Sequence, residues 1–121
     1  LWQYVIRSRQ ITKENYNRLK RNTMKEYIFK QYLDNVLEHM EISKKDFFEN
    51  KSSREVTARR ILYYMCSNKG IGDYDIESYI SRQGYKISRT AIAKGRKVAN
   101  ETLEKDSDYK YIIKKLQDIE L

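Results

Sequence analysis

The sequence predicts an all-α protein, a small helical bundle with a helix-turn-helix, preceded by a basic N-terminal helix. Apolar residues recur at helical spacing along nearly the whole chain, and no stretch shows the alternation of a half-buried strand. The chain has no Pro and only four Gly, so few positions force a helix to end. Two short helical segments, residues 73–82 and residues from 88 onward, flank a turn signal at Gly84, and the second is basic. This order is typical of a helix-turn-helix.

Length and charge indicate one small domain with a basic extension. The 121 residues are 40% hydrophobic, which is enough for a single small core. The net charge is +8, and residues 1–30 carry eight Lys or Arg against two acidic residues. We therefore divide the chain into a basic helical extension, residues 1–30, and a helix-turn-helix domain, residues 31–121. A basic balance fits a nucleic acid or another anionic partner, and a merely soluble basic protein is the other interpretation.

The first predicted helices lie before residue 50. Thr12 can cap a helix that begins near Lys13. We expect either one long helix here or two, broken near residues 22–23. The apolar positions that keep a rough helical period are Tyr16, Leu19, Tyr27, Leu33, Val36 and Met40. Ser43 can cap a short helix that runs through Phe47 and Phe48.

A capping box predicts the next helix, residues 54–68. Ser52 stands three residues before Glu55, so each side chain can bond to the open backbone amide of the other. The segment Lys69-Gly70-Ile71-Gly72 then ends the helix. Its inward positions are Val56, Ile61, Leu62 and Met65.

Three further helices complete the predicted bundle. We expect their caps at Asp73, Ser88 and Ser107, and the helix that follows Ser88 runs to about residue 104. Their inward positions are, in order, Ile76, Tyr79 and Ile80; Ile92 and Val98; and Tyr111, Ile112 and Leu116.

The sequence favours a protein that is not an enzyme and that holds neither a metal nor a cofactor. His39 is the only His and Cys66 the only Cys, so no cluster has metal-ligand spacing. Neither a GxxxxGK[ST] loop nor a GxGxxG turn is present. The acids at 73, 75 and 77 resemble the carboxylates of a calcium loop, but the Gly and closing Glu of such a loop are missing. Helix capping and a solvated face explain these acids better.

The single cysteine and the lack of a long apolar run bear on location. Cys66 follows the apolar run 61–65, so we expect a buried, inert thiol rather than a nucleophile. A lone Cys fits a reducing compartment, and we expect the cytoplasm. No apolar run approaches the ~20 residues that span a bilayer, so we expect no membrane partner.

Several segments occur in the order seen in one known family. Residues 42–48 resemble an "IxxxDLL" opening, and residues 51–60 resemble a basic "KRxRxxxxPR" stretch without its Pro. Residues 84–98 lie over "GGRDHTTVLHACRKI", with identity at Gly84, Thr90, Arg96 and Lys97. From about residue 36 onward the chain thus resembles the C-terminal DNA-binding domain of the bacterial replication initiator DnaA, a helical module related to the Trp repressor fold.

The resemblance implies double-stranded DNA binding, in replication initiation or its control, or in transcription regulation. The family reads its DNA box through an Asp-His-Thr-Thr tetrad, and here those places hold Ile87, Ser88, Arg89 and Thr90, so only the last Thr is kept. The ATPase module that precedes this domain in the family does not precede it in this sequence. We expect a free-standing relative of the kind that phages and mobile elements carry.

We predict that the helix after Ser88 enters the major groove by its first turn. Arg89 and Thr90 face base edges, since an Arg can hold guanine O6 and N7 with two bonds. Lys86, Ser88 and Lys94 contact phosphates, which position the protein without specifying sequence. A second basic edge, directed to a phosphate strand or the minor groove, consists of Lys51, Arg54, Arg59 and Arg60.

Other interpretations stay open. The chain is alternatively a protein-interaction adaptor that keeps the fold without specific DNA binding, which the loss of three tetrad residues supports. Its run of six cations without an acid across residues 82–97 speaks against an adaptor. RNA binding has no aromatic platform to support it. Residues 1–30 either lie on flanking DNA, serve a homodimer or another protein partner, or pack back on the domain.

Overall fold

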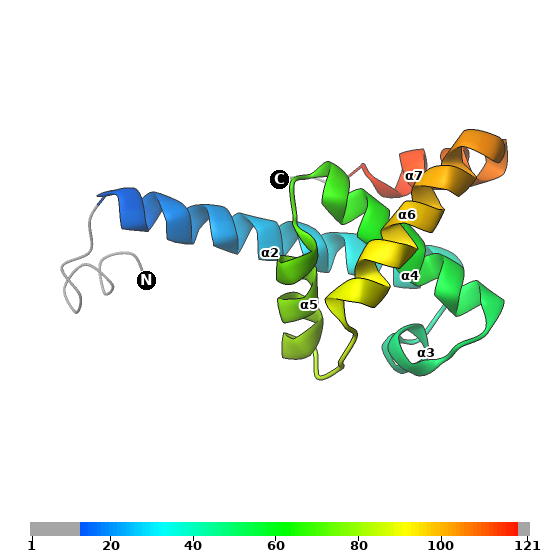
Figure 1. Cartoon of the computed structure of the whole chain (residues 1–121), viewed down its shortest axis with the longest axis horizontal. Helices are drawn as coiled ribbons and strands as arrows, with labels where there is room; N and C mark the ends of the chain where they lie inside the picture. Colours follow the sequence, from blue (N-terminus) through cyan, green and yellow to red (C-terminus); the bar gives the residue numbers. More distant parts are fainter. Residues whose placement is uncertain (1–12, 119–121) are drawn as a thin grey trace.

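The computed structural model describes residues 13–118, and within that range it confirms the all-α class. The described chain forms six helices and no strand (Figure 1). These helices are α2 (Lys13–Met40), α3 (Lys44–Glu49), α4 (Ser53–Asn68), α5 (Asp73–Arg82), α6 (Arg89–Lys105) and α7 (Ser107–Leu116).

The helix α2 is continuous, so the alternative of a break near residues 22–23 is wrong. Its second half supplies core residues, among them Phe29 and Val36, while its first half projects from the bundle (Figure 1). Tyr27, one of the expected apolar positions, is 43% exposed. The helix passes residue 30 without interruption, and the division there stays a prediction. The expected cap Thr12 lies outside the described residues.

Two of the predicted caps are confirmed. The hydroxyl of Ser43 accepts a hydrogen bond from the backbone N–H of Asp46 at 3.2 Å. The hydroxyl of Ser88 accepts one from the N–H of Ala91, also at 3.2 Å. Both side chains therefore satisfy an amide that the first turn of a helix leaves open.

Two other caps differ by one residue from the prediction. Gly72, not Asp73, is the N-cap of α5, and the Asp73 carboxylate is instead bound by Arg96. Asp106, not Ser107, caps α7, because its carboxylate accepts from the N–H groups of both Asp108 and Tyr109. A carboxylate that meets two amides and the positive end of the helix is the stronger cap.

The prediction that the side chains of Ser52 and Glu55 bond to each other's backbone amides is wrong. Ser52 is the N-cap, but its hydroxyl donates to the Glu55 carboxylate instead of accepting from an amide. This hydrogen bond is the largest cause that lowers the pKa of Glu55. The two side chains satisfy each other, and both stay at the first turn of α4.

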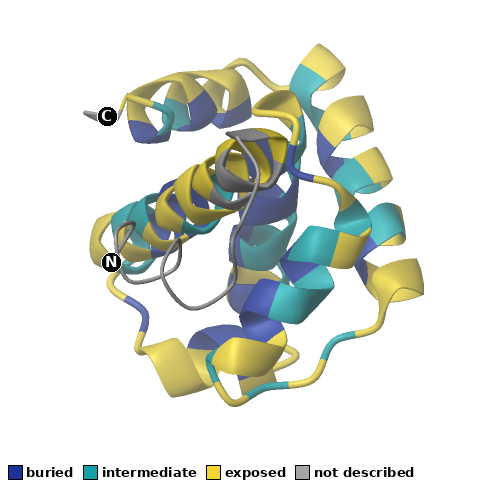
Figure 2. Ribbon diagram, turned by 90° about the vertical axis from the view of Figure 1, so that its left-hand side faces the viewer, coloured by how far each residue is buried: buried dark blue, intermediate teal, exposed yellow. Residues whose placement is uncertain are grey.

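The core lies around α4, which packs against α2, α3, α5 and α6 (Figure 2). Ile61, Leu62 and Met65 of α4 are buried as predicted, whereas Val56 is only half-buried. The other core residues of α4 are Ala58, Tyr63 and Cys66.

The predicted inward face of α5 is confirmed, and that of α7 is rotated. Ile76, Tyr79 and Ile80 of α5 are buried. In α7 only Leu116 of the three expected residues is buried; Tyr111 is 67% exposed and Ile112 half-buried. The buried face runs through positions 109, 113 and 116, at the spacing of one helix face, and position 111 lies nearly opposite it.

Candidate nucleic-acid interface

The turn between α5 and α6 is held by its own residues. Gly84 has φ 94°, a left-handed conformation that an L side chain adopts only with strain. Tyr85, next in the chain, stacks on Phe48 of α3 with ring centroids 4.5 Å apart and an angle of 21° between the rings. The turn is therefore anchored to α3, and it fixes where α6 begins.

A close approach of α6 to α4 sets how α6 crosses the bundle. Gly95 is buried, and a Cβ built on it would lie 2.9 Å from Cδ2 of Tyr63. Only a residue without a side chain lets the two helices come this near. Ile92 and Ala99 are buried on the same side of α6, while Val98, expected inward with Ile92, is half-buried.

The opposite side of α6 is exposed and basic. Thr90, Lys94 and Lys97 follow each other at spacings of four and three residues, so they share one helix face, and all three are exposed. No acidic residue occurs between Glu77 and Glu101. The first half of α6 therefore presents positive charge to its surroundings.

A groove runs between α6 and the α3–α4 region, and cations line it. Lys86 and Lys94 contribute from the turn and from α6, and Lys51, Arg59 and Arg60 contribute from the other side. Glu49 is the one acidic residue in its lining. Lys86, Ser88 and Lys94 of the first predicted group thus border one depression with three residues of the second, whereas Arg89 and Thr90 do not line it.

Two arginines of the predicted second edge are bound within the fold. The Nη1 of Arg59 donates to the carbonyl oxygens of Phe47 and Asn50, which end α3. The Nη2 of Arg54 donates to the carbonyl of Glu41 at 3.3 Å. Arg54 does not line the groove, whereas Lys51 and Arg60 do, and the side chains of these two make no hydrogen bond among the described residues. Of the predicted second edge, Arg54 and Arg59 thus donate to backbone carbonyls, whereas Lys51 and Arg60 do not.

Arg89, the predicted base reader, contacts α5. Its Nε lies 3.4 Å from Oε1 of Glu77, and its backbone N–H donates to Oε2 of the same carboxylate at 3.0 Å. Its guanidinium carbon lies 5.4 Å from the centre of the Tyr74 ring. The side chain of Arg89 is nevertheless 61% exposed, so its outer end is open to a partner.

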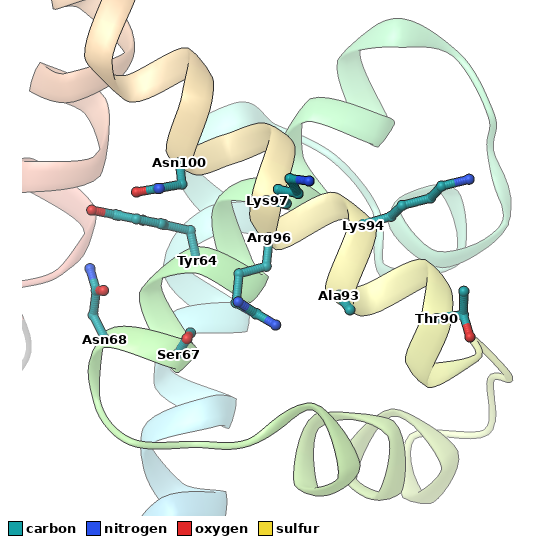
Figure 3. A pocket seen from close by; sticks show the side chains of 9 residues that line it. All are labelled: Tyr64, Ser67, Asn68, Thr90, Ala93, Lys94, Arg96, Lys97 and Asn100. Carbon is teal, nitrogen blue, oxygen red and sulfur yellow. The ribbon is translucent and has the colours of Figure 1, made fainter.

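A second depression lies on the other side of α6, toward the end of α4 (Figure 3). Thr90, Lys94 and Lys97 border it together with Ser67 and Asn68. Figure 3 shows Lys94 and Arg96 leaving α6 in different directions. Arg96 binds Asp73 with two hydrogen bonds, which raise the pKa of the guanidinium. Arg96 therefore joins α6 to α5.

Sequence reasoning missed Glu77 as part of this interface. It placed the acids of α5 on a solvated face, yet Asp73 and Glu77 each pair with an Arg of α6. The four-residue spacing of these two acids and the seven-residue spacing of Arg89 and Arg96 place each pair of like charges on one helix face. Matching charged faces on consecutive helices was the available signal.

The single cysteine and the single histidine lie apart from the groove. Cys66 is fully buried, and burial raises the pKa of its thiol, as expected for an inert side chain. His39 is exposed near the end of α2. Residues 13–118 contain no group of three or more His, Cys, Asp or Glu side chains that could hold a metal ion. Over the same residues no helix is long and apolar enough to cross a membrane.

Comparison of the chain with protein-family models, with curated proteins and with solved structures found no match.

Proposed function

We propose that this protein binds double-stranded DNA through α5, the Gly84 turn and α6. One observation carries the proposal: the outward face of the first half of α6 is exposed, basic and free of acids, and it is held at a fixed position by the anchored turn and the close contact at Gly95. An α-helix fits the major groove, and a helix-turn-helix places its second helix there. Replication control and transcription regulation are the roles this activity would serve.

In this proposal the start of α6 reads the bases. Arg89 and Thr90 are the first two residues of α6, and both are exposed. The guanidinium of Arg89 is suited to guanine, whose O6 and N7 accept two bonds. The hydroxyl and methyl groups of Thr90 suit a phosphate or a thymine methyl.

The groove beside α6 suits one phosphate strand. When a helix lies in the major groove, the two sugar-phosphate backbones pass along its sides. Lys86 and Lys94 border the groove on one side and Lys51 and Arg60 on the other, and all four carry positive charge toward it. Such contacts supply most of the affinity and little of the sequence preference. Arg59 contributes charge to this groove while its Nη1 stays bound to α3.

The projecting half of α2 adds a further basic surface. Arg18, Lys20 and Arg21 are exposed, and the backbone carbonyl of Asn22, next in the chain, accepts a hydrogen bond from the hydroxyl of Tyr79 on α5. A basic helix that extends past the domain suits phosphates beyond the site covered by α6.

Selection from a random duplex pool over a range of salt concentrations tests the proposal. We expect binding that weakens with salt, with a log–log slope of about 0.9 for each phosphate contacted, and an enriched sequence motif. The variants Arg89→Gln and Lys94→Gln separate the two kinds of contact: the first should lose the motif, the second should lower the slope by about 0.9. Absence of duplex binding at low salt would overturn the proposal and favour the protein-interaction adaptor.

A further inference from the structure

A carboxylate stands beside the predicted base-reading arginine. One carboxylate oxygen of Glu77, on α5, forms an ion pair with Nε of Arg89. The other oxygen accepts a hydrogen bond from the backbone N–H of Arg89. Tyr74, one turn earlier on α5, lies beside the same guanidinium at 5.4 Å. The side chain of Arg89 therefore lies between a carboxylate and an aromatic ring, although it remains 61% exposed.

This contact leaves one defined edge of the guanidinium available. The Nε edge faces Glu77, and the two terminal nitrogens of Arg89 have no hydrogen-bond partner among the described residues. Those nitrogens carry the pair of N–H groups that can meet O6 and N7 of guanine. An Arg whose rotamer is fixed beforehand loses less side-chain entropy when it binds.

Glu77 also opposes binding to phosphate at this position. The backbone N–H of Arg89 is at the first residue of α6, where open amides and the helix dipole favour an anion. The carboxylate of Glu77 already accepts from that N–H, and its negative charge repels a phosphate from it. A phosphate contact carries no sequence information, so excluding it here favours base reading.

We infer that Glu77 is a positioning residue for specificity: it fixes Arg89 to read a guanine and keeps a phosphate from the backbone N–H of Arg89. The inference rests on the proposed DNA binding and deepens it. It assigns a guanine to the base that Arg89 meets, and it predicts that removing the charge of Glu77 loosens discrimination while the fold persists.

The test compares Glu77→Gln with Asp75→Asn in the full chain. Both variants remove one negative charge from α5. Asp75 faces Lys25, with 4.0 Å between the charged atoms, and has no contact with α6 among the described residues. For each protein the affinity is measured on the duplex selected by the wild type, on the same duplex with the guanine replaced, and on an arbitrary duplex.

We expect both variants to bind the arbitrary duplex more tightly, because each lowers the repulsion of phosphate. Only Glu77→Gln should lower the ratio of affinities for guanine over its replacement, by about tenfold, the discrimination of one bidentate pair. Arg89→Gln should lower the same ratio, and the double variant should lower it no further. Thermal unfolding of each variant checks that the fold is kept, and Glu77→Asp, which keeps the charge on a shorter side chain, should recover part of the ratio.

The outcomes separate this inference from the proposed function. A wild type that binds no duplex overturns both. A wild type that selects a motif, while Glu77→Gln keeps the ratio seen with Asp75→Asn, overturns the role of Glu77 and leaves DNA binding intact. A wild type that binds every duplex equally also overturns it, because Arg89 then reads no base.

Discussion

Arg96 of α6 donates two hydrogen bonds to the carboxylate of Asp73 of α5, from Nε to Oδ1 at 3.2 Å and from Nη2 to Oδ2 at 2.9 Å. The pair links the first residue of α5 to the middle of α6, across the turn that joins them. Together with the contact between Glu77 and Arg89, it fixes the angle between the two helices at two points.

The first prediction is that Arg96 serves stability and not phosphate binding. Arg96→Gln should lower the free energy of unfolding by about 1 kcal/mol, because the pair is bidentate but partly exposed to solvent. The salt dependence of duplex binding should stay unchanged. Lys94→Gln, an exposed neighbour on α6, should show the reverse: unchanged stability and a smaller salt slope. Urea unfolding and a salt titration measure both, and a smaller slope for Arg96→Gln would assign that residue to DNA.

The second prediction separates two adjacent arginines of α4. Arg59 donates to the carbonyl of Phe47 in α3 and to that of Asn50 at the end of α3, so Arg59→Met should cost about 2 kcal/mol, the loss of two charge-assisted hydrogen bonds of which one is partly buried. Arg60→Met keeps the apolar stem and should change stability by about 0.5 kcal/mol or less. Urea unfolding at pH 7 compares the two. Equal losses would contradict the anchoring role of Arg59.

Local signals in the sequence were enough for most helices. Capping serines and Gly-containing turns depend on a few neighbouring residues, and so Ser43, Ser88 and the α5–α6 turn were placed correctly. The cap at Ser107 was placed one residue late because Asp106 stands directly before it and its carboxylate accepts from the open amides. The cap at Asp73 was placed wrongly because Gly72 takes that position and a distant partner binds the carboxylate of Asp73. Asp73 is bound by Arg96, 23 residues away, and no local pattern records that contact.

In the candidate interface, too, some features follow from local sequence and others depend on how the helices pack. The exposure of Thr90 and Lys94 follows from helical spacing, which is a local property. The use of Arg59 to hold α3 and the placement of Glu77 beside Arg89 depend on how helices pack, at separations of nine to twelve residues. Glycine at position 95 is explained only by the ring of Tyr63 on another helix.

The third prediction concerns that glycine. Gly to Ala inside a helix normally gains up to about 1 kcal/mol. Gly95→Ala should instead lose about 1–3 kcal/mol, because its methyl group would meet the buried ring of Tyr63 at 2.9 Å. In a Tyr63→Leu background the same change should cost less, since the ring is gone. Thermal unfolding of the four proteins measures this coupling, and an additive result would show that the ring does not set the crossing.

The fourth prediction is a loss of stability at high pH. Burial raises the pKa of Tyr63 and of Tyr109 to about 12. In the unfolded chain a tyrosine ionises near pH 10, so between about pH 10 and 12 the folded state holds the extra protons and stability falls as pH rises. Each buried tyrosine contributes a slope of up to about 1.4 kcal/mol per pH unit.

Two variants check the source of this slope. Tyr63→Phe removes a group that must ionise, so the free energy of unfolding should fall less steeply above pH 10. Tyr111→Phe is the control, because Tyr111 is 67% exposed and its removal should leave the slope as it is. Urea unfolding from pH 9 to 12 measures all three proteins, and identical curves would show that Tyr63 ionises as easily folded as unfolded.

The fifth prediction concerns the projecting half of α2 and the length of DNA it needs. Residues 13–21 extend about 13 Å beyond Asn22, at about 1.5 Å per residue, which corresponds to about four base pairs. Replacing Arg18, Lys20 and Arg21 by Gln should weaken binding to a duplex of about 24 base pairs. The log–log salt slope of that binding should fall by up to about 2.7, which is about 0.9 for each of three phosphates. A second duplex is trimmed to the site that this triple variant protects. On that shorter duplex the wild type and the triple variant should bind with equal affinity.

The matched control removes three exposed lysines of α7: Lys110, Lys114 and Lys115. It lowers the net charge by the same amount, so a general electrostatic effect would weaken binding equally in both triple variants and on both duplexes. A loss confined to the α2 variant and to the long duplex assigns the contact to α2. The reason is geometric, because a helix that extends past the site of α6 can meet phosphates only where the duplex continues beneath it.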